Sequence, residues 1–405
     1  MAEKKETKKL RDTDAEQLLK QKVSGSEAER LLKQKLAVIR VTHMLEERGL
    51  LVRTWGSVSR RSDRDHFIIT PSGIAYRDLR PERIVRVNLK RLSYRGRIAP
   101  SSEMAMHAAI YQLRGEDAGF VIHTHQPYAS CASALGESLI DLPHNTPDMM
   151  EDITALPVVP YAPPGTKALA EQVSDTITRN PYCQGVLLSH HGLLCWGRNE
   201  KQARSRAESI EILCYSYLSD ACKTTLQYGI QERFSSERTG EEDIRYLDPE
   251  TPERIRIIHR YIYAKRPDVN AVIHTVSEAE LIVSRRYQVV YPLFDDFAQI
   301  VGAEVRIFGN ERESNGDALN VGKNVNVVFS PGDGAFCLGE NRLEAEACAL
   351  IVNKDCIAQI AQTRNGKEQA LPYRHCVRAN RQYKKDYSTL LDRYANREET
   401  TASLE

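Results

Sequence analysis

Two histidines stand one residue apart in the segment VIHTHQPYAS, residues 121–130. The β-branched residues before them favour a strand, and side chains at positions i and i+2 of a strand point to the same face. His123 and His125 would therefore project together. Neutral imidazole is the commonest transition-metal ligand, so the pair indicates a metal site that needs at least one more ligand. On this segment alone, two polar side chains at a strand end are an equally good interpretation.

The spacing of apolar residues predicts the elements that must position these histidines. A capping-box pattern at Ser26 and Glu29 begins a helix that ends at Gly49. A helix is expected to start near residue 101 and to lead into the strand that carries the histidine pair. The remaining expected elements are strands at 50–54, 57–61 and 65–70, a turn at 71–73, a strand–turn–strand unit at 185–197 and a long helix from 200 to about 222.

Two pairs of similar segments occur in the same order along the chain. Residues 116–135 resemble 267–286, and residues 189–213 resemble 331–355. Similarity in register predicts a duplicated domain with a boundary near 236–250. The second copy is expected to lack most of the strand-rich segment that opens the first. The predicted division is a charged extension (1–25), a first domain (26–235), a second domain (250–362) and a polar C-terminal tail or appended helix (363–405).

Composition narrows the class of protein. The 405 residues are 41% hydrophobic and 27% charged, and the formal net charge is +1. This balance argues against a generally nucleic-acid-coating surface, and no apolar run approaches the length that crosses a bilayer. The nine cysteines include no CxxC pair, and the first ten residues have no apolar core of a secretory signal. We expect a cytoplasmic protein with reduced thiols and without nucleic-acid or membrane partners.

Four ordered pieces of the first copy carry a resemblance to a known family. They are TWGSVSRR, ITPSGIAY, APSSEMAMH and the combination of VIHTH with LLSHHGLL. Together they resemble the class II aldolase/adducin family, over about residues 30–225 and more weakly over 250–360. The resemblance implies a three-layer α/β/α domain with a central, mostly antiparallel sheet. It also implies metal-dependent chemistry on a sugar phosphate.

The same resemblance implies roles for particular residues. The metal ligands would be His123, His125 and His191, and Glu103 would be the catalytic acid/base. Three imidazoles with an open position suit catalytic zinc, with manganese, cobalt or iron as alternatives, and a nearby carboxylate can move the proton that forms an enediolate. Small and hydroxyl residues of three loops would bind the substrate phosphate, namely Ser57, Ser72, Gly73, Ser101 and Ser102.

Taken singly, several of these residues have simpler interpretations. Ser101 alone would be a helix N-cap, and Glu103 alone a solvated carboxylate in the first turn of a helix. His107 and His190 are interpreted as structural residues rather than ligands. The combination and its order favour the functional interpretation.

The sequence also departs from the family pattern. Ser57 stands where an asparagine often contacts phosphate, and the segment at 142–150 has no tyrosine to donate a proton to the aldehyde. In the second copy, Val276 replaces the second histidine, Asp333 replaces His191 and Ile255 replaces Glu103. We therefore expect the second copy to be a scaffold without a catalytic metal.

The expected function is a metal-dependent aldolase that cleaves a sugar phosphate or related ketose. The alternatives are an epimerase, decarboxylase or dehydratase of the same family, or a non-catalytic adducin-like module, against which the intact histidine triad argues. Because single-domain members form four-fold rings, two copies in one chain predict a homodimer or a higher homo-oligomer.

Overall fold

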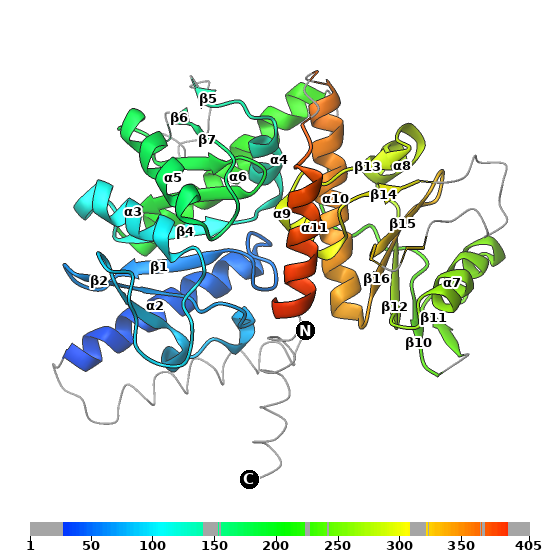
Figure 1. The fold of residues 1–405 in the computed structure, drawn as a ribbon, viewed down its shortest axis with the longest axis horizontal. Coiled ribbons are helices and arrows are strands. Elements are labelled where there is room, and N and C mark those ends of the chain that lie inside the picture. The colour runs from blue at the N-terminus through cyan, green and yellow to red at the C-terminus, as the bar shows by residue number, and fades with distance from the viewer. Residues whose placement is uncertain are drawn as a thin grey trace, which may run out of the picture.

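The chain forms two units, each a sheet covered by helices. The computed structural model describes residues 27–140, 153, 155–222, 227–240, 243–307, 321–322, 324–364, 366 and 369–387. Figure 1 shows one sheet on each side, with helices α10 and α11 standing between them. Each unit has helices on both faces of its sheet, so the predicted duplicated α/β/α architecture is confirmed.

The first sheet has seven strands in the order β3-β2-β1-β4-β9-β8-β7. All neighbouring strands pair antiparallel except β7 and β8, which are parallel. The strands are β1 (Ser57–Arg61), β2 (His66–Ile69), β3 (Val85–Asn88), β4 (Phe120–Thr124), β7 (Val158–Val159), β8 (Gly185–Leu188) and β9 (Gly192–Gly197). A separate two-stranded sheet pairs β5 (Leu139–Ile140) with β6 (Ala155–Leu156).

Alternation along β4 separates the two helical layers of the first unit. Val121 packs in the cluster beneath α3 (Met104–Arg114) and α5 (Lys167–Arg179). Ile122 packs in the cluster on the opposite face, beneath α2 (Glu27–Glu47), α4 (Pro127–Ala134) and α6 (Glu200–Cys222). Since side chains two apart on a strand share a face, His123 lies on the face that α3 covers.

The second sheet repeats the centre of the first. Its five strands run in the order β11-β10-β12-β16-β15. They are β10 (Ser236–Arg238), β11 (Ile244–Tyr246), β12 (Ala271–Thr275), β15 (Val327–Ser330) and β16 (Gly334–Gly339), and β13 (Val289–Val290) pairs separately with β14 (Val305–Arg306). The register also repeats, because His123 faces Leu194 across β4 and β9 while His274 faces Phe336 across β12 and β16.

A buried polar network occurs in both units at matching places. In the first unit, the Ser59 hydroxyl lies 2.7 Å from both His107 Nδ1 and the Tyr111 hydroxyl. In the second unit, the Ser236 hydroxyl lies 2.5 Å from His259 Nδ1 and 3.0 Å from the Tyr263 hydroxyl. Such satisfied networks specify one packing of a core. Their repetition supports the sequence alignment of the two copies.

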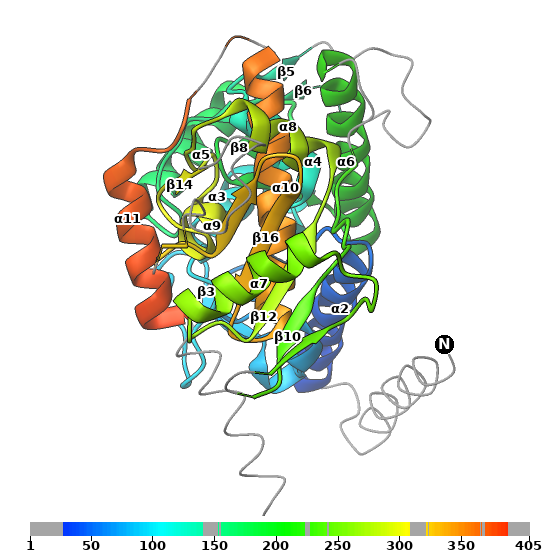
Figure 2. The same cartoon turned by 90° about the vertical axis from the view of Figure 1, so that its right-hand side faces the viewer.

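Helix α10 (Arg342–Arg364) joins the two units. One cluster of buried apolar residues contains Ile122 and Ala207 of the first unit together with Cys348 and Ile357 of α10. Figures 1 and 2 show α10 and α11 (Tyr373–Gln382) running alongside the first unit. The other helices of the second unit are α7 (Glu253–Lys265), α8 (Glu278–Arg286) and α9 (Asp295–Ile300). The two copies therefore share a core instead of forming separate bodies.

Two expectations about local structure were wrong. Residues 50–54 form no strand and make only an isolated bridge between Val52 and Trp55, because the chain turns there with Arg53 at a φ of 56°. The predicted domain boundary at 236–250 contains β10 and β11, which join the second sheet through pairing of β10 with β12. The second unit therefore begins before residue 250. The other domain limits stay predictions.

The segment from 363 onward contains helix α11, whose Cys376 is buried against Ala298 and Leu371.

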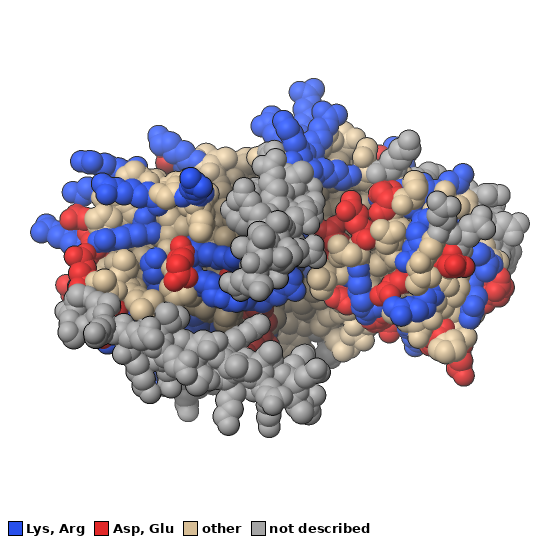
Figure 3. Space-filling view, turned by 90° about the horizontal axis from the view of Figure 1, so that it is seen from below, with Lys and Arg blue, Asp and Glu red and all other residues tan. Residues whose placement is uncertain are grey.

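Figure 3 shows basic and acidic side chains interspersed over the face viewed from below. Within the described residues, no helix combines the length and apolar character that spanning a bilayer requires.

A glycine at the start of β1 allows this strand to approach β4. Gly56 has a φ of 99°, and a Cβ there would lie 2.5 Å from the His123 carbonyl oxygen. Positive φ costs an alanine about 1–2 kcal/mol, and overpacking adds about 1–3 kcal/mol. We predict that Gly56→Ala lowers the free energy of unfolding by more than Gly49→Ala, measured by urea denaturation. Gly49 is the matched control because its φ is 71° but a Cβ would meet no atom within 4 Å. Equal losses in the two variants would contradict the close approach.

Candidate metal centre and active site

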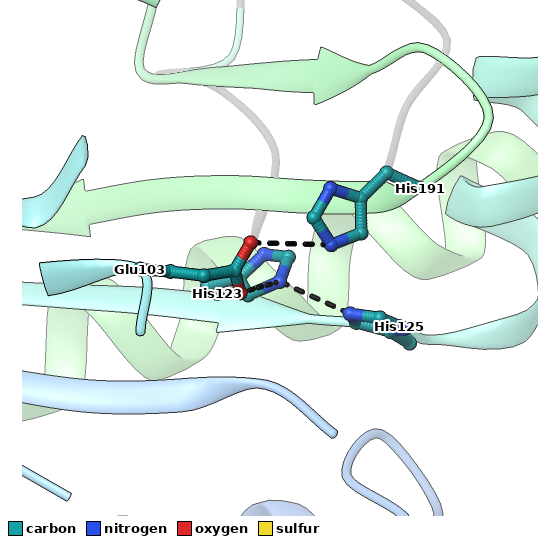
Figure 4. Close-up of side chains that lie close together, drawn as sticks. All are labelled: Glu103, His123, His125 and His191. Atoms are coloured by element: carbon teal, nitrogen blue, oxygen red, sulfur yellow. Dashed lines mark hydrogen bonds and ion pairs between the residues drawn. The ribbon is translucent and has the colours of Figure 1, made fainter. Parts of the chain in front are cut away.

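Three histidines and one glutamate converge at the end of β4. His123 lies in β4, His125 directly follows it, His191 directly precedes β9, and Glu103 directly precedes α3. Figure 4 shows the four side chains pointing toward one another. Each offers one ligand atom, and these atoms all lie within 4.8 Å of one another. The three imidazole ring centroids are 4.7–5.0 Å apart.

The turn between β8 and β9 positions His191. The His191 amide donates to the Leu188 carbonyl at 3.0 Å, and His190 takes a φ of 58° to make the turn tight. Gly192 then lets β9 approach the end of β4, because a Cβ there would lie 2.2 Å from the Thr124 carbonyl oxygen. The glycine that follows the two histidines is thus a packing requirement of the site.

Glu103 lies at the N-cap position of α3, one residue before the helix itself. The Ser101 hydroxyl accepts a hydrogen bond from the Glu103 amide at 3.3 Å, but Ser101 lies two residues before the N-cap position, so its interpretation as the N-cap is wrong. The carboxylate is buried, and its two oxygens lie 3.0 Å from His123 Nε2 and 3.4 Å from His191 Nε2. The solvated first-turn interpretation of Glu103 is therefore wrong.

The hydrogen bonds behind two of the rings decide which nitrogens carry protons. His123 Nδ1 lies 2.9 Å from the Leu193 carbonyl oxygen, and His125 Nδ1 lies 3.3 Å from Asp296 Oδ2. Both partners can only accept, so each Nδ1 carries the proton and each neutral ring presents a bare Nε2. These two Nε2 atoms are 3.1 Å apart, and His123 Nε2 also faces the Glu103 carboxylate. Lone pairs therefore meet without protons between them.

Protonation of the histidines would remove the repulsion between these lone pairs, but burial opposes the formation of a charged imidazolium. Burial lowers the pKa of His125, and it lowers the pKa of His191 to about 3 although Glu103 acts in the opposite direction.

The donor set fits a divalent cation. Metal–nitrogen bonds of about 2.0–2.1 Å place neighbouring tetrahedral ligand atoms about 3.3 Å apart, close to the separations seen in this cluster. Two further atoms of the cluster, Glu103 Oε1 and His191 Nδ1, are buried without a hydrogen-bond partner among the described residues. His123, His125 and His191 would hold the ion, and the Glu103 carboxylate is near enough to be a fourth ligand.

Four of the five predicted phosphate-binding residues come from two loops that lie side by side. The Ser72 amide donates to the Ala99 carbonyl and the Ser101 amide to the Thr70 carbonyl, both at 3.0 Å. These bonds bring Ser72 and Gly73 beside Ser101 and Ser102, and Ser102 is exposed.

Ser57 is separated from this group by its side-chain contacts. Its hydroxyl is fully buried and lies 2.9 Å from His107 Nε2. His107 therefore contacts serines at both ring nitrogens, and His190 Nδ1 donates to the Leu293 carbonyl at 2.8 Å. Neither of these histidines belongs to the cluster.

A set of residues from the second copy and the C-terminal helix lies behind the cluster and was not predicted from the sequence. Asp296 of α9 contacts His125, and Lys354 of α10 contacts Asp296. Beside them, Asp295 Oδ1 accepts from the Tyr161 hydroxyl at 3.0 Å and lies 2.6 Å from His375 Nε2 of α11. Burial and the charge of Asp295 raise the pKa of Tyr161, so the phenol keeps its proton. The available signal was two aspartates inside the apolar run LFDDFAQI.

The corresponding place in the second copy has different chemistry. His274 Nε2 lies 2.7 Å from the Asp333 carbonyl oxygen, and its ring stacks on Phe336 with centroids 4.3 Å apart. Ile255 is buried at the place of Glu103. Among the described residues, the one cluster suited to a metal is that of the first copy.

Comparison with known proteins assigns the family. The class II aldolase and adducin N-terminal domain matches residues 36–218 and again 238–360. The chain belongs to this family, with two copies of the domain.

Individual relatives match the first copy. A 5-deoxy-D-ribulose 1-phosphate aldolase of Bacillus thuringiensis is 33% identical over 170 residues, 42% of this chain and 76% of that protein. L-fuculose phosphate aldolase of Escherichia coli is 33% identical over 171 residues, with the same shares. A solved L-fuculose 1-phosphate aldolase is 29% identical with a TM-score of 0.42, over 46% of this chain and 84% of that one. The family match and the two sequence relatives place the chain with the aldolase-type lyases of its family.

The geometry predicts that the ligands of the metal come from the first copy alone. We expect the purified protein to contain about one divalent ion per chain, and His191→Ala to lose it because a coordinating nitrogen is removed. His274→Ala is the matched control, since His274 holds the place of His123 in the second copy. Elemental analysis after gel filtration measures the content. About two ions per chain, or an equal loss in both variants, would contradict the assignment.

Proposed function

We propose that the first copy binds one divalent ion, zinc in the first instance, and cleaves a sugar phosphate or related ketose. The convergence of His123, His125, His191 and Glu103, with two bare imidazole lone pairs facing each other, is the observation that carries the proposal. When bound, the ion supplies Lewis-acid stabilisation of the negative charge that develops beside the ketose carbonyl. Manganese, cobalt and iron are the alternative ions.

Glu103 is the acid/base in this proposal. Retro-aldol cleavage breaks one carbon–carbon bond, and its electron pair stays with the carbonyl half as an enediolate. Overall, one proton moves from the hydroxyl of the departing carbon to the carbon beside the carbonyl. Glu103 delivers the proton to that carbon, and it removes the same proton in the condensation direction. Its contacts to two of the histidines hold the carboxylate at the place where this carbon must lie.

The loops that carry Ser72, Gly73, Ser101 and Ser102 are proposed to bind the substrate phosphate. Hydroxyls and backbone N–H groups at a helix start favour an anion, and Ser102 precedes α3 by two residues. Ser57 would contribute through its backbone, because its hydroxyl is occupied by His107.

The protein is proposed to act in the cytoplasm.

We also infer a homodimer, from a comparison of α6 with α10. Alignment of Cys214 with Cys356 places Ile212 at the position of Lys354. Lys354 of α10 is buried against the first unit, whereas Ile212 of α6 is 47% exposed. One helical turn and two turns further on, Ala358 and Gln362 are buried where Ser216 and Asp220 of α6 are exposed.

The face of α10 that corresponds to this exposed face of α6 is covered by helix α4 of the first copy. Gln362 of α10 donates to the Ala134 carbonyl of α4 at 2.7 Å, so α10 docks on α4. By the same relation, the open face of α6 would dock on α8 of a second chain, because α8 is the counterpart of α4. Two chains would then close a ring of four domains.

Glu103→Gln is predicted to reduce turnover of a ketose 1-phosphate by roughly two to four orders of magnitude, because the proton-transfer group is lost. Aldehyde release is measured at saturating metal, so that any loss of metal affinity does not enter. Glu116→Gln, beyond the far end of α3, is the control and should keep normal turnover. Epimerised or decarboxylated product without aldehyde would assign the site to another reaction of the family.

Ile212→Glu is predicted to shift the protein from dimer to monomer, because a charge would be placed in the inferred interface. Light scattering at micromolar concentration measures the mass. Tyr182→Glu is the control, since Tyr182 is 82% exposed in the loop before β8. A monomeric unmodified protein would overturn the ring.

A further inference from the structure

The candidate metal site is held from behind by the second copy. His125 Nδ1 lies 3.3 Å from Asp296 Oδ2, an atom contributed by a residue 171 positions further along the chain. Lys354 Nζ lies 2.5 Å from the same oxygen. Asp296 is 2% exposed and Lys354 is 3% exposed, so the pair is sealed from solvent.

This contact fixes the state of His125. An ionised carboxylate only accepts hydrogen bonds, so it keeps the His125 proton on Nδ1 and leaves Nε2 bare on the side of His123. The ammonium group of Lys354, 2.5 Å from Asp296 Oδ2, compensates the charge of this buried carboxylate. A carboxylate behind a histidine also increases the basicity of the nitrogen that faces the metal.

The simpler interpretation is an ion pair that only joins the two copies. Two features argue against it. A buried ion pair is weak support for stability, because desolvation offsets most of the attraction, and apolar residues could join the units equally well. In addition, the first copy has Ile212 at the place of Lys354, so the shared fold does not require the lysine. The positive charge of Lys354 instead lies beside the Asp296 carboxylate, which contacts His125 of the site.

We propose that Asp296 and Lys354 are positioning residues by which the second copy orients His125 for metal binding. The proposal rests on the proposed function of His125 as a ligand. It gives the second copy a role that the loss of its own ligands had hidden: it completes the site of the first copy within the same chain.

The test uses the full-length double variant Asp296→Asn/Lys354→Met, which removes both charges and so leaves no buried charge unpaired. We expect its dissociation constant for Zn²⁺, measured by competition with a chelator, to rise about 10–100-fold. We also expect the visible absorption of the Co²⁺-loaded protein to change, because one imidazole is no longer held in place. A role in packing alone would not move this spectrum.

Asp355→Asn is the matched control. Asp355 is buried next to Lys354, but it accepts from the Leu293 amide and from Gln359 and touches no histidine of the cluster. It should keep the native Zn²⁺ affinity and Co²⁺ spectrum. If the double variant does not fold, Asp296→Asn alone is measured in the same way.

Native affinity and an unchanged spectrum in a folded variant would overturn the proposal. This outcome is distinct from failure of the proposed function, which would appear as metal-loaded wild-type protein that cleaves no ketose phosphate. Loss of affinity in the variant with no cleavage by the wild type would support the positioning role and reject the aldolase reaction.

Discussion

Electrostatic conflict among buried acceptors is the constraint on which the rest of this structure depends. His123 and His125 are each forced by an acceptor behind the ring to present a bare nitrogen, and Glu103 adds a carboxylate to the same small volume. Such a group of lone pairs is costly in a low-dielectric interior unless a cation lies among them. Metal binding is therefore the natural resolution of an arrangement that packing alone would not favour.

The sheet is what keeps these acceptors together. Antiparallel pairing of β4 with β9 fixes the end of one strand beside the start of the next, and Gly192 and Gly56 permit backbones to approach where a Cβ could not fit. The polar network of Ser59, His107 and Tyr111 locks α3 onto β1, and α3 begins just after Glu103. Residues without a chemical role thus determine where the chemical groups lie.

The second copy shows how a duplicated domain can change its contribution. It retains the sheet order, the register and the serine–histidine–tyrosine network, while His274 stacks on Phe336 and no longer faces other imidazoles. Its helices α9 and α10 instead lie against the first copy, where Asp296 contacts His125 and Asp295 contacts Tyr161. The expectation of a pure scaffold followed from examining the second copy by itself.

The sequence by itself determined the duplicated fold, the pairing of His123 with His125, and the absence of a matching set in the second copy. His191 and Glu103 were added by the resemblance of the ordered motifs to the family. These conclusions depend on strand periodicity, on short motifs and on their order, all of which are local properties of the chain. Two predictions of local structure from the sequence were wrong. Residues 50–54 have strand composition but turn at Arg53. The predicted domain boundary contains β10 and β11, and β10 pairs with β12.

Only the tertiary structure decided which residues of the second copy reach the site. Asp296 and His125 are 171 residues apart, and no periodicity or spacing relates two such positions. Ser57 shows the same limit, because its hydroxyl faces His107 once β1 has packed beneath α3, whatever its motif implies. The contact between Asp296 and His125 depends on how α9, α10 and α11 dock against the first unit, and the contact between Ser57 and His107 depends on how α3 docks on β1. Docking is set by the burial of whole helical faces, and that is a property of the folded chain rather than of any segment of its sequence.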